Sequence, residues 1–336
     1  MNVALAEAGK GVGRTAPNPP VGAVVVKDGR LLGSGWHRAA GLPHAEREAL
    51  AAAVRNHGRE EVRGATVYVT LEPCSSHGRT PPCTDGLIEA GVARVVYACI
   101  DHDSSHFGRA DGRLREAGIE VESGVESAAA EEVMRPFFKV RKTGLPWVMW
   151  KCAMSLDGRL TRPPGEGQWL SCEASRADVQ RLRAQVDAIL TSGETVRRDR
   201  PALTIRVPEL VAGRPQPWRV VLSGNPASLP ADAPLFTDED RQRTLIRSGA
   251  DLPGVLRGLV IDQGVLSVLV EAGGRLSGAL FEAGLIDEVV VYLAPMICGG
   301  PVPAVAGLEL PASLRLTPFE VTRCGDDVRL RALVLR

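Results

Sequence analysis

The chain has 336 residues, 44% of them hydrophobic and 24% charged, a balance typical of a soluble globular protein long enough for two ordinary domains. Its 40 basic and 40 acidic residues cancel, which argues against a broad nucleic-acid-binding surface. An aromatic content of only 4% argues against a stacking platform for single strands. No apolar run approaches the ~20 residues that span a bilayer.

Cysteine usage and the N-terminus indicate the compartment. Seven cysteines are scattered along the chain, and an odd, dispersed set is a poor disulfide framework. Such a set fits a reducing compartment, where paired cysteines more often bind metal. The first residues, MNVALAEAGKGVG, have neither the apolar core nor the cleavage pattern of a signal peptide. We therefore expect a cytoplasmic protein with no membrane partner.

The first part of the chain alternates between strand and helix patterns. VGAVVVK and LLGSGWH flank Asp28-Gly29, a favoured pair for a tight hairpin turn. The order of elements predicts a central sheet with helices on both faces. The expected elements are helix 2–12, strands 21–27 and 31–37, helix 44–56, strand 65–71, helix 83–91, strand 93–99, helix 109–117, strand 119–122 and helix 126–141.

A break at Gly144 and Pro146 predicts a domain boundary, giving domains 1–143 and 144–336. The second domain again reads as α/β, although the stretch 207–260 is rich in proline and glycine and gives little pattern. The expected elements are strand 147–155, helix 173–185, strands 187–191, 218–222 and 243–246, a strand–glycine–helix unit at 265–284, and strands 287–293, 318–324 and 327–335.

The clearest chemical signal is a set of possible metal ligands in the first domain. His44 opens a predicted helix after Pro43, Cys74 follows a buried strand, and Cys83 opens the next helix. A helix N-terminus favours thiolate over thiol. One imidazole and two thiolates make three protein ligands for zinc, and a three-ligand zinc keeps a fourth position open for water, as catalytic sites do.

Glu46 lies two residues after His44, on the same helical turn. A carboxylate there could take a proton from zinc-activated water and deliver it to a ring nitrogen and a leaving amine, which is the known His-x-Glu and Pro-Cys signature of zinc deaminases. Two plainer interpretations remain: the residues are inert singly, or the zinc is structural with His77 or His37 as a fourth ligand. A structural zinc would leave Glu46 without a role.

Several longer segments resemble one enzyme family, the bacterial bifunctional riboflavin-biosynthesis deaminase–reductases, over nearly the whole chain except about 207–260. The segments that carry the resemblance are PNPPVGAVVVKDGR, GWHRAAGLPHAE, GATVYVTLEPCSSHGRTPPC and LIEAGVARVV in the first domain, and KCAMSLDGRL, QWLSCEASRADVQRLRAQVDAILTSGETV, DRPALTIR and VEAGGRLSGALFEAGLIDEVVVYLAPMICGG in the second.

The resemblance implies a fold and two consecutive reactions. The first domain would be a cytidine-deaminase-like three-layer α/β/α domain, and the second a dihydrofolate-reductase-like α/β domain. The first would hydrolyse the ring amine of 2,5-diamino-6-(5-phospho-ribosylamino)pyrimidin-4-one with Zn²⁺. The second would use NADPH to reduce the ribosyl group to ribityl. The expected partner is this small phosphorylated pyrimidine, and we also expect a homo-oligomer.

In the first domain the resemblance assigns zinc to His44, Cys74 and Cys83, proton transfer to Glu46, and a substrate contact to Asn18, for which an Asx-turn before Pro19 is an equal alternative. The sequence departs from the family at two nearby positions. Ser76 stands where the family usually has histidine, and Asp103 stands where it usually has asparagine.

In the second domain, paired glycines between a strand and a helix allow a phosphate to approach the backbone, although many such turns use glycine. The resemblance implies a cofactor-phosphate site formed by Gly273, Gly274, Arg275, Leu276, Ser277, Gly278 and Ala279. It also implies NADPH contacts at Ala153, Trp169, Thr195 and Asp199, and substrate contacts at Gly167, Arg183, Leu203, Arg206 and Glu271.

Arg183 and Arg206 suit a substrate phosphate, because guanidinium pairs with phosphate in a fork. Lys151 and Asp199 are the expected catalytic polar groups near the ribose carbon that receives hydride. Met296 and Ser223-Gly224 replace residues that the family usually has. The rival hypotheses are a tRNA or nucleobase deaminase with an appended nucleotide-binding domain, and a non-catalytic sensor of a flavin precursor or nucleotide.

Overall fold

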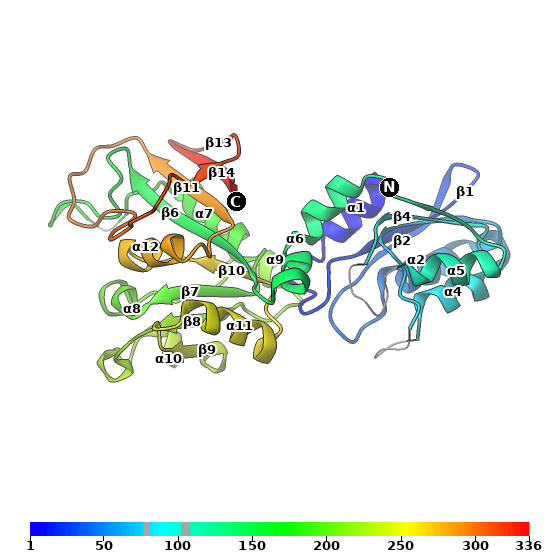
Figure 1. Cartoon of the computed structure of the whole chain (residues 1–336), viewed down its shortest axis with the longest axis horizontal. Coiled ribbons are helices and arrows are strands. Elements are labelled where there is room, and N and C mark those ends of the chain that lie inside the picture. Colours follow the sequence, from blue (N-terminus) through cyan, green and yellow to red (C-terminus); the bar gives the residue numbers. More distant parts are fainter. Residues whose placement is uncertain (77–80, 102–107, 168, 336) are drawn as a thin grey trace. The chain divides into compact units, whose positions relative to one another are not determined.

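The computed structural model describes residues 1–76, 81–101, 108–167 and 169–335. The chain divides into two compact units, Met1–Gly144 and Leu145–Arg336 (Figure 1). Within the described residues, no helix is long and apolar enough to cross a membrane.

The N-terminal unit is built on a five-stranded sheet of order β2-β1-β3-β4-β5. β1 runs antiparallel to β2 and β3, whereas β3, β4 and β5 are parallel. Its elements are α1 (Asn2–Gly9), β1 (Gly22–Lys27), β2 (Arg30–Trp36), α2 (Ala45–His57), α3 (Arg59–Val62), β3 (Thr66–Leu71), α4 (Cys83–Ala90), β4 (Arg94–Cys99), α5 (Arg109–Glu116), β5 (Glu120–Ser123) and α6 (Ser127–Thr143).

Two apolar clusters show that helices cover both faces of this sheet. Tyr97 of β4 belongs to the cluster made with α2, α4 and α5, whereas its neighbour Ala98 belongs to the cluster made with α6. Alternation along a strand sends successive side chains to opposite faces, so both layers are needed to bury them. The turn between β1 and β2 places Asp28 at φ 50° and Gly29 at φ 74°, which confirms the predicted hairpin.

Two glycines of β2 bring α2 unusually close to the sheet. A Cβ atom at Gly33 would lie 2.4 Å from the backbone nitrogen of Ala53, and one at Gly35 would lie 2.5 Å from that of Ala49. Only glycine permits this approach. The same packing fixes the N-terminal end of α2, where His44 and Glu46 lie.

The C-terminal unit contains a nine-stranded sheet of order β12-β14-β11-β6-β10-β7-β8-β9, with β13 paired to β14. Strands β6 to β11 are parallel, and β14 runs antiparallel to β11. Its strands are β6 (Trp147–Ser155), β7 (Ala188–Ser192), β8 (Trp218–Leu222), β9 (Thr244–Arg247), β10 (Ser267–Val270), β11 (Glu288–Ala294), β12 (Arg315–Leu316), β13 (Glu320–Cys324) and β14 (Asp327–Leu335).

Helices cover both faces of this sheet too. Val148 and Trp150 pack in the cluster that contains side chains of α11 and α12, whereas Met149 packs in the cluster with α7 and α8. The helices are α7 (Glu173–Arg183), α8 (Gly193–Asp199), α9 (Pro208–Val211), α10 (Pro234–Thr237), α11 (Leu252–Gln263) and α12 (Gly274–Glu282), with short 3₁₀ turns η1 (Pro226–Ser228) and η2 (Arg241–Arg243).

Candidate active sites of the two units

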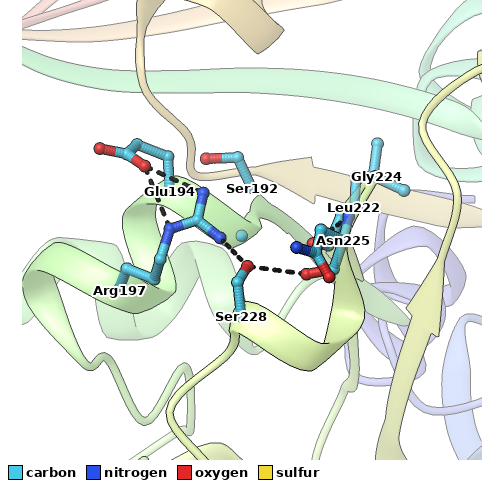
Figure 2. Close-up of a pocket in the computed structure, with 9 residues that line it drawn as sticks. Ser192, Glu194, Arg197, Leu222, Gly224, Asn225 and Ser228 are labelled. Atoms are coloured by element: carbon cyan, nitrogen blue, oxygen red, sulfur yellow. Dashed lines mark hydrogen bonds and ion pairs between the residues drawn. The ribbon is translucent and has the colours of Figure 1, made fainter.

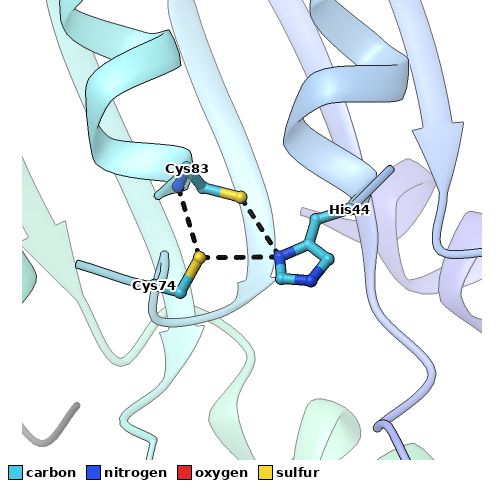
Figure 3. A group of neighbouring side chains, drawn as sticks. All are labelled: His44, Cys74 and Cys83. Atoms are coloured by element: carbon cyan, nitrogen blue, oxygen red, sulfur yellow. Dashed lines mark hydrogen bonds between the residues drawn. The ribbon is translucent and has the colours of Figure 1, made fainter. Parts of the chain in front are cut away.

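Three candidate metal ligands converge in the N-terminal unit, at the starts of two helices and the end of one strand (Figure 3). His44 Nδ1 lies 3.5 Å from Cys74 Sγ and 3.3 Å from Cys83 Sγ, and all three ligand atoms fall within 4.8 Å of one another. Tetrahedral zinc with ordinary Zn–N and Zn–S bonds separates its ligand atoms by about 3.5 Å. The observed spacing therefore fits one zinc ion, with Nδ1 as the imidazole ligand atom.

Charge in this cluster also fits a bound cation. The hydrogen bond with Cys83, together with His44, lowers the pKa of the Cys74 thiol to about 4, although burial opposes the shift. Interaction with that sulfur, and then burial, raises the pKa of Cys83. Two sulfurs thus compete for one proton beside the carboxyl group of Glu46. A divalent cation would stabilise both thiolates at once.

Glu46 is fully enclosed on the first turn of α2, with 4% of its surface exposed. Burial, and next the charge of Cys74, raises its pKa, and its side chain contacts Cys83. Among the residues that the structure describes, His44, Cys74 and Cys83 are the group able to hold a metal ion, so a fourth tetrahedral position stays available. The carboxyl group thus lies against Cys83 and is not one of the three candidate ligands.

His37 does not qualify as a fourth ligand, because both of its ring nitrogens have other partners. Nδ1 lies 3.1 Å from the carbonyl oxygen of Pro43, and Nε2 lies 2.9 Å from Nδ2 of Asn18. The other proposed ligand, His77, lies outside the described residues. Asn18, expected as a substrate contact, is thereby brought to the same part of the unit as His44.

Glu72 precedes the candidate ligand Cys74 by two residues, and the sequence analysis assigned it no role. It is buried, and its carboxylate accepts hydrogen bonds from the backbone N–H groups of Asp101, Gly108 and Ala110. It therefore holds both ends of the segment after β4. The sequence signal that could have indicated this role is a charged residue directly after an apolar strand. Asp103, the expected departure in this segment, lies outside the described residues.

In the C-terminal unit, three other expected residues, Lys151, Arg183 and Arg206, lie around the carboxylate of Glu271. The guanidinium of Arg183 donates two hydrogen bonds to Glu271, at 2.7 and 3.1 Å, and a third to the Thr204 carbonyl at 2.8 Å. Lys151 Nζ lies 4.0 Å from the same carboxylate. Burial opposes ionisation of Glu271, but the charges of Arg183, Lys151 and Arg206 keep its pKa below the usual value.

This arrangement distinguishes the two arginines expected to bind phosphate. The fork of Arg183 is engaged with Glu271, and its side chain is only 11% exposed. Arg206 is exposed, with its backbone N–H bonded to Gln180. Of the two, Arg206 is therefore the more exposed residue. Leu203 is buried with φ 52°, in the segment that Arg183 holds through Thr204.

The two glycines before α12 have different surroundings. A Cβ atom at Gly273 would meet nothing within 4 Å, whereas one at Gly274 would lie 2.3 Å from the carbonyl oxygen of Pro303. Gly278, one turn later, would place a Cβ 2.1 Å from the carbonyl oxygen of Ala306. From the sequence, we expected both paired glycines to let a phosphate approach the backbone. The structure leaves space at Gly273 alone and uses Gly274 for close packing.

The remaining expected residues differ in exposure. Ser277 is buried; its hydroxyl donates to the Gly273 carbonyl and accepts from the Trp150 indole N–H, so this side chain is engaged inside the fold. Arg275 and Asp199 are exposed, Asp199 at the end of α8. The other expected contacts comprise the half-buried Ala153, Thr195, Leu276 and Ala279, the buried Gly278, and the exposed Gly167 and Trp169.

A cavity of about 390 Å³ lies at the start of α8 (Figure 2). Its lining residue Ser192 is hydrogen-bonded to Thr195, so we call it the cavity beside Thr195; sequence reasoning missed it. Residues of α8 and of the turn after β8 line it: Ser192, Gly193, Glu194, Arg197, Leu222, Ser223, Gly224, Asn225 and Ser228. The Arg197 guanidinium donates to Glu194 and, at 2.8 Å, to Ser228 Oγ. The carboxyl ends of parallel strands are where α/β sheets commonly bind ligands.

Comparison with known proteins identifies the family. Residues 146–330 match the model of the RibD C-terminal domain, and residues 1–99 match the cytidine and deoxycytidylate deaminase zinc-binding region. The riboflavin biosynthesis protein RibD of Escherichia coli is 42% identical, covering 98% of this chain and 97% of its own length. The chain belongs to the RibD family. The Mycobacterium tuberculosis RibD is 41% identical, over 100% of this chain and 96% of the relative.

Solved structures of RibD proteins show the same fold over the full length. Acinetobacter baumannii RibD matches with a TM-score of 0.88 and 37% identity, covering 100% of this chain and 98% of the other. A Thermotoga maritima diaminohydroxyphosphoribosylaminopyrimidine deaminase/5-amino-6-(5-phosphoribosylamino)uracil reductase matches with a TM-score of 0.88, 31% identity, and 100% and 97% coverage. Two-domain similarity over the whole chain favours the RibD assignment over a tRNA or nucleobase deaminase.

These matches confirm several predictions from the sequence. The family, the cytidine-deaminase-like and dihydrofolate-reductase-like folds, and the pairing of a deaminase with a reductase are as expected. Zinc and NADPH are the cofactors of this RibD protein, which is a hydrolase in one unit and an oxidoreductase in the other.

Proposed function

We propose that the N-terminal unit hydrolyses the ring amine of 2,5-diamino-6-(5-phospho-ribosylamino)pyrimidin-4-one, and that the C-terminal unit reduces the ribosyl group of the product to ribityl with NADPH. The observation that carries the proposal is the convergence of His44, Cys74 and Cys83 beside the buried carboxyl group of Glu46. A ligand set with an open position and a neighbouring proton carrier is what hydrolytic deamination requires.

In the deaminase site, His44, Cys74 and Cys83 hold the ion. Zinc, when bound there, acts as a Lewis acid that activates water near neutral pH. Glu46 would pass one proton of the attacking water to the ring nitrogen and then carry the second, from the new hydroxyl group, to the leaving amine. Water and the ring C–NH₂ group become the ring carbonyl and ammonia. The enclosure of Glu46 suits this task, because a raised pKa lets one carboxyl group both accept and donate a proton.

In the reductase site, NADPH supplies the hydride, and the chain orients it and excludes water. Backbone N–H groups at the start of α12, next to the open space at Gly273, would hold the coenzyme phosphates. Lys151 and Asp199 are the catalytic polar groups near the ribose carbon that receives the hydride. Lys151 is oriented by the carboxylate of Glu271 and by the ring of Tyr292, whose centroid lies 5.9 Å from Lys151 Nζ. Arg206 takes the substrate phosphate.

The cavity beside Thr195 suits the adenosine end of NADPH. Ser192, Ser223 and Ser228 offer hydroxyl groups, and Arg197 offers the positive charge that a 2′-phosphate requires. Glu194 also pairs with Arg198, so two guanidinium groups face one carboxylate, and the local charge favours an anion.

Purified protein given the diamino-pyrimidine tests both halves of the proposal. We expect ammonia release without NADPH, and NADPH oxidation after the amine has been removed. Metal analysis of the same sample should give one zinc per chain. Zinc-loaded protein that released no ammonia would contradict the deaminase assignment, and ammonia release with no NADPH oxidation would contradict the reductase assignment.

We further propose that the enzyme works in the cytoplasm as a homo-oligomer, with no nucleic-acid or membrane partner. Its zero formal net charge argues against a nucleic-acid partner. Exposed apolar side chains on β13, β14 and the segment before β13, namely Phe319, Val321 and Leu335, support self-association. Light scattering that gave the mass of one chain at working concentration would contradict the oligomer.

A further inference from the structure

His37 lies immediately after β2 and is almost completely enclosed, with 2% of its surface exposed. Its Nδ1 faces the Pro43 carbonyl oxygen at 3.1 Å. A carbonyl oxygen only accepts hydrogen bonds, so Nδ1 must carry the proton. In a neutral imidazole the other nitrogen is then an acceptor. The group facing Nε2 must therefore be a donor, and that group belongs to Asn18.

This requirement fixes which way the side-chain amide of Asn18 points. The amide has one donor end and one acceptor end, and the two are distinguished by their hydrogen-bond partners. At 2.9 Å from His37 Nε2, the NH₂ end is engaged inside the protein. The acceptor oxygen, Oδ1, is therefore at the opposite end of the amide.

The backbone of Asn18 is held as well. Its N–H donates to the Thr15 carbonyl at 2.9 Å, and its own carbonyl accepts from the Thr15 hydroxyl at 2.9 Å. Loop and side chain are thus both oriented before any ligand arrives, which is the condition for a recognition group that loses little entropy on binding. Asn18 itself is only half-buried, so its amide remains accessible.

His37 also contacts the metal-binding segment. Its ring meets that of His44 edge-on, with centroids 5.3 Å apart and planes at 84°. The carbonyl that it holds belongs to Pro43, the residue directly before His44. One imidazole therefore links the Asn18 loop to the start of α2.

We propose that His37 is a positioning residue of the deaminase: through the Nδ1–H···Pro43 and Asn18 Nδ2–H···Nε2 hydrogen bonds it turns Asn18 Oδ1 toward the substrate. The inference rests on the proposed deaminase function. The site then selects ligands that present an N–H or O–H donor to Asn18, and it disfavours those that present a second acceptor. His37 touches neither the metal nor the reacting atoms.

The tautomer can be tested on the intact protein without substitution. Long-range ¹H–¹⁵N spectra of protein labelled at its six histidines should show His37 protonated on Nδ1 and unprotonated on Nε2, with His37→Gln identifying the signal. A proton on Nε2 would overturn the inference, because the amide of Asn18 would then be reversed.

A double-mutant cycle tests the action through Asn18. His37→Leu and Asn18→Ala should each raise the KM for deamination about tenfold, the value of one misplaced hydrogen bond, with kcat changed by less than about threefold. The double variant should lose no more than about tenfold in total, because both changes remove the same contact. His37→Gln, whose amide can donate to Pro43 and accept from Asn18, should recover most of the loss.

Additive losses of about a hundredfold in the double variant would mean that His37 acts independently of Asn18, and would overturn the inference. A loss in kcat alone would do the same. Zinc content and NADPH-dependent reduction of deaminated substrate serve as controls for folding. If His37→Leu fails to fold, the position of the His37 ring proton in the unmodified protein decides the matter. Absence of ammonia release from the unmodified enzyme would instead contradict the proposed function.

Discussion

Individual side chains in this protein gain their chemistry from burial combined with one specific neighbour. Glu46 is enclosed beside Cys74 and Cys83, and its pKa is raised by burial first. Glu271 is largely enclosed, with 12% of its side chain exposed, but Arg183 and Lys151 lower its pKa. Two buried carboxyl groups thus have opposite tendencies, one suited to carrying a proton and one to remaining charged.

Glu46→Gln should separate metal binding from proton transfer. The amide keeps the shape of the side chain and cannot shuttle a proton, so ammonia release should fall by about 10²–10⁴-fold. Zinc content should stay at the level of the unmodified protein, since Glu46 is not among the ligands. Reduction of deaminated substrate is the internal control, and an equal loss of both reactions would contradict two separate sites.

Glu271→Gln should destabilise the C-terminal unit, because Arg183 would be left buried without its counter-charge. The expected loss is about 3 kcal/mol in the free energy of unfolding, measured by urea denaturation at pH 7. The folded-state pKa of Glu271 lies below the unfolded value. Its contribution is therefore present above the unfolded pKa and disappears as pH falls through the folded one. The variant should consequently lose less stability than the unmodified protein on acidification.

Arg197→Ala tests the cavity beside Thr195 as a coenzyme site. Removing the guanidinium should raise the KM for NADPH about five- to tenfold and leave the KM for NADH nearly unchanged, because only NADPH carries the 2′-phosphate. The exposure of Arg197, 38%, keeps the expected effect modest. Equal changes for both coenzymes would place the 2′-phosphate elsewhere.

At the level of helices and strands, most of the fold could be predicted from pattern alone. The β1–β2 hairpin follows from Asp28-Gly29, and α2, α4 and α6 follow from helix-forming runs that end in glycine. Between residues 207 and 260 the sequence was much less informative. α11 contains Gly254 and Gly258, which lower helix propensity, whereas Pro253 lies in its first turn, where proline is tolerated. Burial of Leu256 and Leu259 in tertiary packing stabilises the helix.

The site residues also divide into those that the sequence could indicate and those that only the fold brings together. His44, Cys74, Cys83 and Glu46 could be found because their spacing has a chemical meaning. The cavity residues are common types from two separate segments, 192–197 and 222–228, and only the fold brings these segments together. The Asn18–His37 contact likewise spans 19 residues; both residues lie in segments that carry the family resemblance, but the sequence did not indicate that their side chains meet.

The glycines of α12 provide a matched pair for an element-level test. Gly278→Ala places a methyl group against the backbone carbonyl of Ala306, which should cost about 1–3 kcal/mol and lower the melting temperature by several degrees. Gly273→Ala meets nothing within 4 Å and has φ −73°, so melting should be unchanged. Its methyl group would instead narrow the expected phosphate site and raise the KM for NADPH. Identical melting of both variants would contradict the packing role of Gly278.

At the scale of the whole molecule, the two reactions need different surroundings. Deamination consumes water at the ion, whereas hydride transfer requires water to be excluded. Each apolar cluster takes its residues from one unit only, Met1–Gly144 or Leu145–Arg336. Because each unit has its own core and its own candidate site, each chemistry is built on a separate scaffold.

Metal removal tests this separation. A chelator should abolish ammonia release and lower the melting temperature of the N-terminal unit, because Cys74 and Cys83 lose the cation that stabilises their thiolates. Reduction of deaminated substrate should continue at about its original rate, since the candidate coenzyme and substrate residues lie within Leu145–Arg336. Asp199→Asn should have the converse effect, impairing reduction and sparing ammonia release. Loss of reduction on chelation, reversed by added zinc, would show instead that the ion supports both units.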